Sequence, residues 1–192
     1  MPEATTVQDL TITPAEGGIT APDGFRSAAL HCGIKAKANA LDLTVIAADS
    51  PVSAAAIFTT NLAQAAPVLV SKDHLARTGG KARAIVVNSG CANACTGDQG
   101  MADAARMAAD VATALGCDPS EVLVASTGVI GVNLKMDRVS SGIQGAVAAL
   151  ARGKGSETAR AIMTTDPFPK EYAVTVQTAR GSFTVGGTAK GS

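Results

Sequence analysis

The sequence has very few aromatic residues: it contains no tryptophan, one tyrosine and four phenylalanines among 192 residues. Adhesive protein surfaces draw much of their affinity from buried tryptophan, tyrosine and arginine side chains, so this shortage argues against a surface of that kind. The chain has instead 38 alanines and 20 glycines. Small residues let helices and sheets approach closely, and we therefore expect a core of tightly packed layers.

An excess of either charge is also lacking. The 16 basic and 16 acidic residues give a net charge of zero, which argues against a nucleic-acid partner or an anionic membrane surface. No stretch approaches the roughly 20 apolar residues that a membrane span needs. The first basic residue is Arg26, whereas signal and transit peptides carry positive charge near their start. We therefore expect a cytoplasmic protein.

Cysteine and histidine are too sparse to indicate a disulfide scaffold or a metal centre. The chain has two histidines and four cysteines: Cys32, Cys91, Cys95 and Cys117. Cys91 and Cys95 have C-x3-C spacing, but neither a second cysteine pair nor a nearby histidine completes a set of zinc ligands. The chain also has no phosphate-binding G-x4-G-K-[ST] motif. We expect reduced thiols, no metal and no cofactor.

Strand-like and helix-like patterns alternate after a turn-rich start. Residues 1–24 are expected to form a surface segment and residues 25–192 a single α/β domain. Apolar runs rich in β-branched residues predict strands at 41–48, 53–58, 66–70, 82–90 and 122–125, and a hairpin of 172–178 with 182–187. Helices are predicted at 71–77, 97–115, 135–152 and 156–163. Because several strands follow one another directly, the pattern favours a mixed α/β sandwich.

The clearest helix prediction is 97–115. One face of it carries residues at steps of three and four: Met101, Ala104, Ala108, Val111 and Leu115. Thr96 is a candidate N-cap and Gly116 a candidate stop.

Two loops between a strand and a helix could carry chemistry. In "STGVIG" (126–131), Gly128 would let a ligand approach the backbone and Thr127 would add a hydroxyl, as in an oxyanion hole. An ordinary turn explains the same letters. In "NSGCANACTG" (88–97), a nucleophilic Cys91 or Cys95 would need a positioned base, and a tight structural loop is the alternative.

Two later segments offer polar groups. Thr164 and Thr165 in "MTTD" (163–166) could bind a carboxylate or cap a turn. Lys190 lies in a glycine-rich segment, "VGGTAKGS" (185–192), where its charge could reach a ligand or simply be solvated. The chain stops directly after a strand, so we expect it to be part of a longer polypeptide.

These segments occur together, in this order, in one known family. The chain resembles the N-terminal (α) part of ornithine acetyltransferase, a glutamate N-acetyltransferase of arginine biosynthesis. The resemblance covers residues 18–192, where Cys91 and Thr188 depart from the usual family residues. It is carried by the stretches "GITAPDGFRSAA", "GIKAK", "LDLTVI", "AAAIFTTNLAQAAPV", "ARAIVVNSGCANACTGDQG", "EVLVASTGVIG", "RAIMTTD" and "FTVGGTAKGS".

The resemblance implies an acyltransferase whose nucleophile lies outside this chain. Family precursors cleave themselves before a threonine, which becomes residue one of a β chain and accepts acetyl from N2-acetylornithine before glutamate receives it. By similarity, Thr127 and Gly128 form the oxyanion hole, and Thr164 and Lys190 contact substrate. The implied fold is an α-β-β-α-like sandwich of the ornithine acetyltransferase / aminopeptidase DmpA-like type, completed by the β chain in an α2β2 assembly. Acetyl-CoA is a second donor for some members.

Two alternatives stay open on the residues alone. The chain could be a non-catalytic α/β domain that binds a small anion at the turns 88–97 and 126–131. It could also be a thiol enzyme that uses Cys91 or Cys95.

Overall fold

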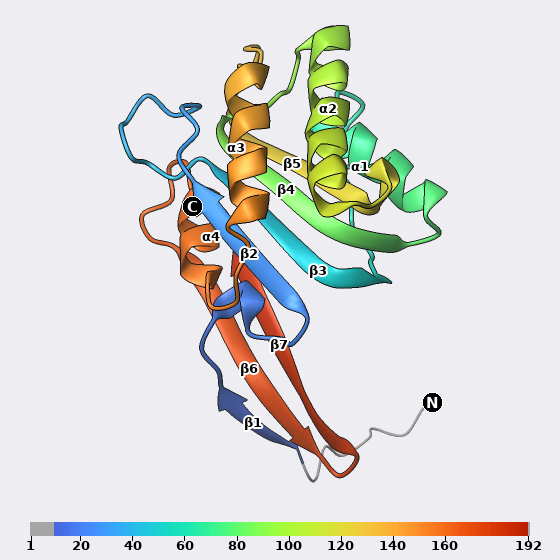
Figure 1. Cartoon of the computed structure of the whole chain (residues 1–192), viewed down its shortest axis with the longest axis vertical. Coiled ribbons are helices and arrows are strands. Elements are labelled where there is room, and N and C mark those ends of the chain that lie inside the picture. Colours follow the sequence, from blue (N-terminus) through green and yellow to red (C-terminus); the bar gives the residue numbers. More distant parts are fainter. Residues whose placement is uncertain (1–9, 192) are drawn as a thin grey trace.

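A four-stranded sheet organises the upper part of the molecule in the computed structural model, which describes residues 10–191 (Figure 1). Its strands are β2 (Phe25–Leu30), β3 (Leu43–Ser53), β4 (Lys81–Cys91) and β5 (Val122–Val129), in the order β2-β3-β4-β5. The β2–β3 and β3–β4 pairs are antiparallel, whereas β5 runs parallel to β4. The carboxyl ends of β4 and β5 therefore meet at one edge, where open α/β sheets commonly bind ligands.

A second, three-stranded sheet extends away from the first (Figure 1). It consists of β1 (Thr11–Pro14), β6 (Lys170–Thr178) and β7 (Gly181–Ala189), in the order β1-β6-β7 and antiparallel throughout. The long β6–β7 hairpin returns the end of the chain to the four-stranded sheet. The predicted hairpin is confirmed with a turn at 179–180.

Three helices cover one face of the four-stranded sheet: α1 (Ala66–Arg77), α2 (Gly97–Leu115) and α3 (Met136–Ala148). The main core lies between them and the sheet, and many of its members are alanine and valine, so the layers approach closely. Two short 3-10 turns lie at Gly18–Thr20 and Pro119–Glu121. None of the helices within residues 10–191 combines the length and the hydrophobicity that a membrane span requires.

The opposite face carries the short helix α4 (Gly155–Ala161) over β2 and β3. Buried hydroxyls hold it there: Thr158 Oγ1 lies 2.9 Å from Ser27 Oγ and 3.1 Å from Thr44 Oγ1. Over β4 and β5 this face is open, since Ile85 is 38% exposed and Ala125 is also exposed.

Several predicted elements are wrong. Residues 66–70, predicted as a strand, begin helix α1, because Pro67 occupies its first turn, where the missing N–H costs nothing. Ser71 is therefore inside this helix, and its hydroxyl forms hydrogen bonds with the backbone of Val124 instead of capping a helix. Strand β3 ends at Ser53, and the following residues 54–65 are mostly exposed and belong to no strand. Residues 126–129 continue β5 instead of forming a loop, because they pair with the end of β4.

The helix boundaries agree with the prediction for α2 but not for α3. Helix α2 has the predicted bounds, and Gly116 ends it in the left-handed region at φ 68°, but the Thr96 hydroxyl donates to Asn93 instead of capping. Helix α3 ends at Ala148, four residues early.

The N-terminal segment includes regular structure. Residues 1–9 lie outside the described part, but from Leu10 on the segment contributes β1, and Gly18 and Thr20 are buried against β6, β7 and α4.

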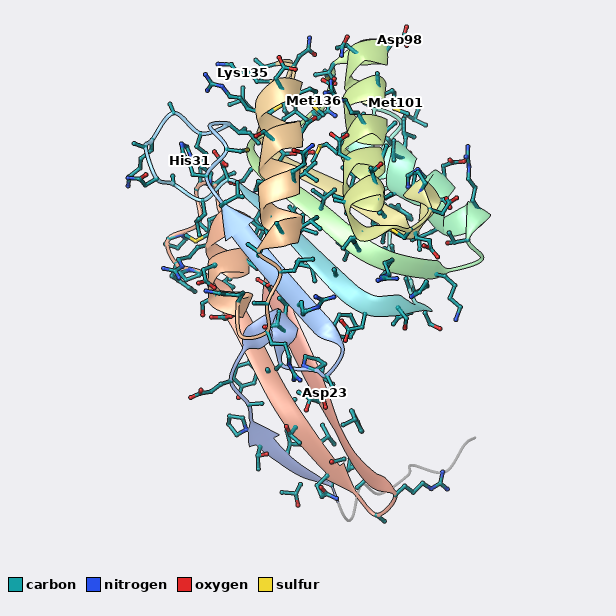
Figure 2. All side chains as sticks on the ribbon, in the orientation of Figure 1. Asp23, His31, Asp98, Met101, Lys135 and Met136 are labelled. Atoms are coloured by element: carbon teal, nitrogen blue, oxygen red, sulfur yellow. The ribbon has the colours of Figure 1, made fainter. Side chains whose placement is uncertain are left out.

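Two methionines on α2 test the packing. Met107 is fully buried, whereas Met101 is 37% exposed near the outer end of the helix (Figure 2). We expect Met107→Ala to lower the free energy of unfolding by about 2–5 kcal/mol, since it leaves a cavity. The matched control Met101→Ala should cost less than about 1 kcal/mol. Denaturant unfolding measures both, and equal losses would contradict the described core.

Candidate active site

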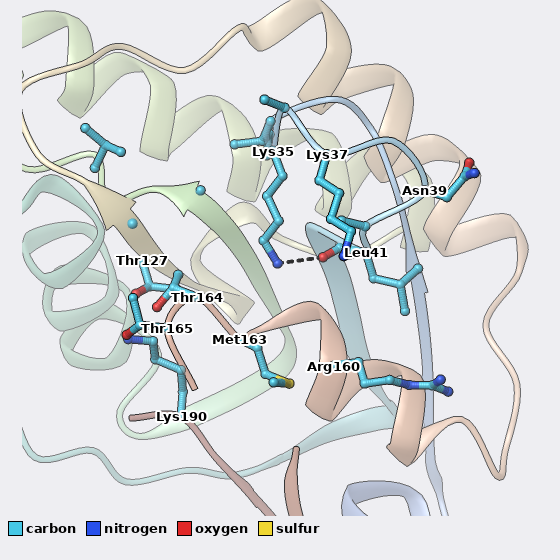
Figure 3. Close-up of a pocket in the computed structure, with 16 residues that line it drawn as sticks. Lys35, Lys37, Asn39, Leu41, Thr127, Arg160, Met163, Thr164, Thr165 and Lys190 are labelled. Atoms are coloured by element: carbon cyan, nitrogen blue, oxygen red, sulfur yellow. Dashed lines mark hydrogen bonds between the residues drawn. The ribbon is translucent and has the colours of Figure 1, made fainter. Parts of the chain in front are cut away.

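An open pocket of ≈ 1140 Å³ lies where β4 and β5 end (Figure 3). All four residues singled out by the family resemblance line it: Thr127, Gly128, Thr164 and Lys190. Figure 3 shows Thr127, Thr164 and Lys190 beside one another, although they come from β5, the loop after α4 and the end of β7. The fold therefore brings together residues up to 63 positions apart in sequence (Thr127 and Lys190).

The pocket floor depends on a close approach of two backbones. Gly90 and Gly128 face each other where the β4–β5 register shifts, with φ values of 109° and 136°. A Cβ atom on Gly128 would lie 2.7 Å from Gly90 Cα and would overlap the Gly90–Cys91 peptide. Only glycine allows this contact, because both the space and the dihedral angle exclude a side chain.

Two residues at this floor are accessible from the pocket. Gly128 is exposed and Thr127 half-buried. The Thr127 hydroxyl has no hydrogen-bond partner within residues 10–191. Thr127 shares the α4-bearing face of the sheet with Ser89, whose hydroxyl donates to Ala161 at the end of α4.

Asp166 joins two of the pocket segments. Its carboxylate accepts hydrogen bonds from Thr164 N (3.0 Å), Gly191 N (2.6 Å) and Lys170 Nζ (2.8 Å). The hydrogen bond with Lys170 holds the pKa of this carboxyl well below its usual range, and the two backbone N–H groups act in the same direction. The Asp166 carboxylate thereby holds together the loop that contains Thr164 and the end of the chain next to Lys190.

Asp42 shapes the opposite wall. Its side chain is fully buried at the start of β3 and accepts hydrogen bonds from four consecutive backbone N–H groups, those of Cys32, Gly33, Ile34 and Lys35, at 2.7–3.2 Å. His31 Nδ1 also lies 3.0 Å from this carboxylate. The loop between β2 and β3 is thereby wrapped around one carboxylate, and its residues 34–37 and 39–41 line the pocket.

Comparison with known proteins identifies the chain. A model described as the ArgJ family matches residues 26–192. The chain belongs to the ArgJ family. The resemblance drawn from the sequence motifs is therefore confirmed at family level.

Curated relatives support this membership. Proteins named arginine biosynthesis bifunctional protein ArgJ are 50% identical in Symbiobacterium thermophilum and 48% identical in Dehalococcoides mccartyi. Each match covers 92% of this chain but only 44% and 43% of the respective relative. The chain thus spans less than half the length of these relatives.

Solved structures confirm the mixed α/β fold. The ArgJ crystal structure from Bacillus halodurans superposes with a TM-score of 0.86 at 38% identity and covers 95% of both chains. An ornithine acetyltransferase from Mycobacterium tuberculosis, solved in complex with ornithine, gives 0.84 at 42% identity over 95% of this chain and 96% of the other.

The ArgJ-family pocket contains cations that the sequence analysis did not single out. Lys35, Lys37 and Arg160 line it together with Lys190, and no carboxylate is among the described lining residues. Lys35 belongs to the family stretch "GIKAK", but an isolated lysine in a loop usually indicates solvent exposure. The sequence analysis also did not single out Asp166, although an acidic residue that follows two threonines and precedes a proline is a common turn signal.

The cysteines do not form a thiol site in the described structure. Cys91 is buried, its thiol donates to Val132 O, and burial raises its pKa. Cys95 is exposed and lies outside this pocket. Both histidines have other partners, Ala40 and Asp42 for His31 and Val122 for His74. Residues 10–191 contain no group of three or more His, Cys, Asp or Glu that could hold a metal.

The Asp166 carboxylate leads to a pH prediction. Because its pKa is depressed in the folded protein, its stabilising effect is fully present above the unfolded pKa of about 3.9 and is lost as the pH falls further. We expect the difference in melting temperature between the wild type and Asp166→Asn to be constant from pH 7 to about 5 and to shrink below about pH 4. Calorimetry across this range measures it. A difference that stays constant down to pH 2 would contradict an ionised clamp.

Proposed function

We propose that this chain is the α subunit of a glutamate N-acetyltransferase (ornithine acetyltransferase). In this proposal, acetyl passes from N2-acetylornithine to glutamate through an acetyl-threonine, and the threonine is residue one of a β chain. The observation that carries it is the convergence of Thr127, Gly128, Thr164 and Lys190 on one open pocket in an ArgJ-family chain. The ornithine complex of the Mycobacterium tuberculosis enzyme supports the substrate class.

The reaction divides into two acyl transfers. The threonine hydroxyl attacks the acetyl carbonyl carbon, while the α-amine of the same residue accepts the hydroxyl proton. The α-amine has an ordinary pKa of about 7.7–8.0, so a useful fraction of it is neutral near pH 7. The C–N bond breaks, the proton passes to the departing nitrogen, and ornithine leaves. The glutamate amine then attacks the carbonyl carbon of the acetyl ester, the C–O bond to threonine breaks, and the proton lost by the amine restores the threonine hydroxyl.

The α chain would supply stabilising groups for both steps. Each tetrahedral intermediate carries negative charge on the former carbonyl oxygen, and Thr127 Oγ1–H and the Gly128 N–H would donate to it. Lys190 and Thr164 would bind a substrate carboxylate, since an ammonium and a hydroxyl are both donors suited to that group.

The β chain would complete the sandwich on the open sheet face. There Ile85, Leu123 and Ala125 project from β4 and β5 beside Thr127, and burial of such apolar area favours association. The greater length of the curated relatives leaves room for such a second part. We infer an α2β2 assembly and a cytoplasmic location on family resemblance and sequence, and we keep acetyl-CoA as a candidate second donor.

Purification of the complete gene product tests the proposal. We expect a co-purifying second chain whose N-terminal residue, found by Edman sequencing, is threonine. The complex should transfer acetyl from N2-acetylornithine to glutamate with ping-pong kinetics, and a parallel assay with acetyl-CoA decides the second donor. A purified product that binds small anions but transfers no acetyl group from either donor would instead identify a non-catalytic binding protein.

Removal of the Thr127 hydroxyl tests the oxyanion role. We expect Thr127→Ala in the complete enzyme to lower kcat about 10²–10³-fold, with a much smaller change in KM, because the donor acts mainly on the transition state. Thr127→Ser retains the hydroxyl and should retain most of the activity. Steady-state kinetics measures both, and an unchanged kcat in the alanine variant would remove Thr127 from the oxyanion hole.

A further inference from the structure

Lys35 reaches the pocket from the loop that Asp42 organises. Its backbone N–H donates to Asp42 Oδ2 at 3.0 Å, which fixes the start of the side chain. Its stem then passes over Gly90, so closely that a Cβ atom at Gly90 would lie 3.2 Å from Lys35 Cγ. Since Gly90 faces Gly128 across the β4–β5 pair, Lys35 lies next to the candidate oxyanion site (Figure 3).

The Lys35 ammonium retains unused donors. Nζ donates to Leu41 O at 2.8 Å, and none of the described carboxylates lies within 4.0 Å of it. An ammonium has three donors, so two stay available to a ligand. Burial lowers the pKa of Lys35, whereas the charges of Asp42 and Asp166 oppose that change. A partly desolvated cation without a direct counter-ion gains from an anionic ligand.

Two of the three ammonium groups that line the pocket, those of Lys35 and Lys190, come from opposite walls. Lys190 lies by Thr127 and Thr165, and Lys35 approaches from the opposite wall (Figure 3). Ligands with two carboxylates match such a pair better than ligands with one. Lys35 is the partly buried member of the lining cations, whereas Lys37, Arg160 and Lys190 are exposed, and Arg160 donates to Ser156 O in its own helix.

We propose that Lys35 binds the side-chain carboxylate of the acceptor and thereby gives the site its preference for a dicarboxylic amino acid. The inference rests on the proposed function, which supplies glutamate as the acceptor. Lys190 would hold the α-carboxylate, and Lys35 would discriminate glutamate from its neutral amide, glutamine. Lys35 is thus a specificity-determining residue that acts in the second half-reaction.

The test compares glutamate with glutamine as acceptors for the complete enzyme, with N2-acetylornithine as donor. Lys35→Met removes the charge from a side chain of similar length. We expect it to raise KM for glutamate about 10–100-fold, the worth of one charge-assisted hydrogen bond. The KM for glutamine should change little, so the preference for glutamate should fall by about the same factor. Lys72→Met, on the exposed side of α1 and outside the pocket, is the matched control.

Two outcomes of this comparison overturn the inference. An unchanged ratio of glutamate to glutamine would exclude Lys35 from carboxylate binding. An equal loss with both acceptors would assign it a structural role. If Lys35→Met lowers the melting temperature, Lys35→Gln, which keeps an N–H donor without charge, repeats the comparison.

A binding measurement separates this inference from the proposed function. Calorimetric titration of wild type and variant with glutamate and with glutamine needs no acetyl transfer. A wild type that transfers no acetyl group refutes the proposed function, while loss of glutamate binding in the variant alone would still support Lys35. Equal glutamate affinity in wild type and variant refutes the role of Lys35, whether or not the enzyme is active.

Discussion

The buried carboxylate of Asp42 is the interaction on which the pocket depends. Four consecutive N–H groups of one loop converge on it, while its own backbone bonds to Leu30 O and Ser89 N. A buried carboxylate needs such donors around it, and within residues 10–191 these four N–H groups have no other hydrogen-bond partner. This mutual requirement orders the loop that carries Lys35 and joins it to β2 and β4, so one wall of the pocket is built before any ligand arrives.

The other wall depends on the Asp166 carboxylate and on two glycines, which have no side chain. Asp166 holds the threonine loop against the Lys190 segment, and Gly90 and Gly128 let the ends of β4 and β5 touch. The two aspartates accept most of their hydrogen bonds from backbone N–H groups, whereas the charged side chains among the described lining residues are all cationic. This arrangement favours anionic ligands, and its preformed geometry lowers the reorganisation that an acyl transfer would require.

Much of the fold follows from local pattern. The periodicity of 97–115 and its terminal glycine determine α2 to the residue, and the alternation at 172–187 determines the hairpin. Prediction failed where context overrides propensity: Val68 and Val70 suit a strand, but Pro67 and packing against β5 make them helical. Thr127, Gly128, Thr164 and Lys190 were singled out as candidate site residues only because several weak motifs occur together. Lys35, Asp42 and Asp166 were missed because a single charged residue has no distinctive spacing.

The sequence by itself determined the family, the mixed α/β class, the small-residue core and the polar residues at strand ends, since these depend on composition and short-range order. Only the tertiary structure decided that β5 continues through Thr127 beside β4, that two aspartates organise the two walls, and that Lys35 joins Lys190 in one pocket. Such contacts link residues many positions apart. Their stability comes from burial and backbone hydrogen bonds that exist only once the chain has folded.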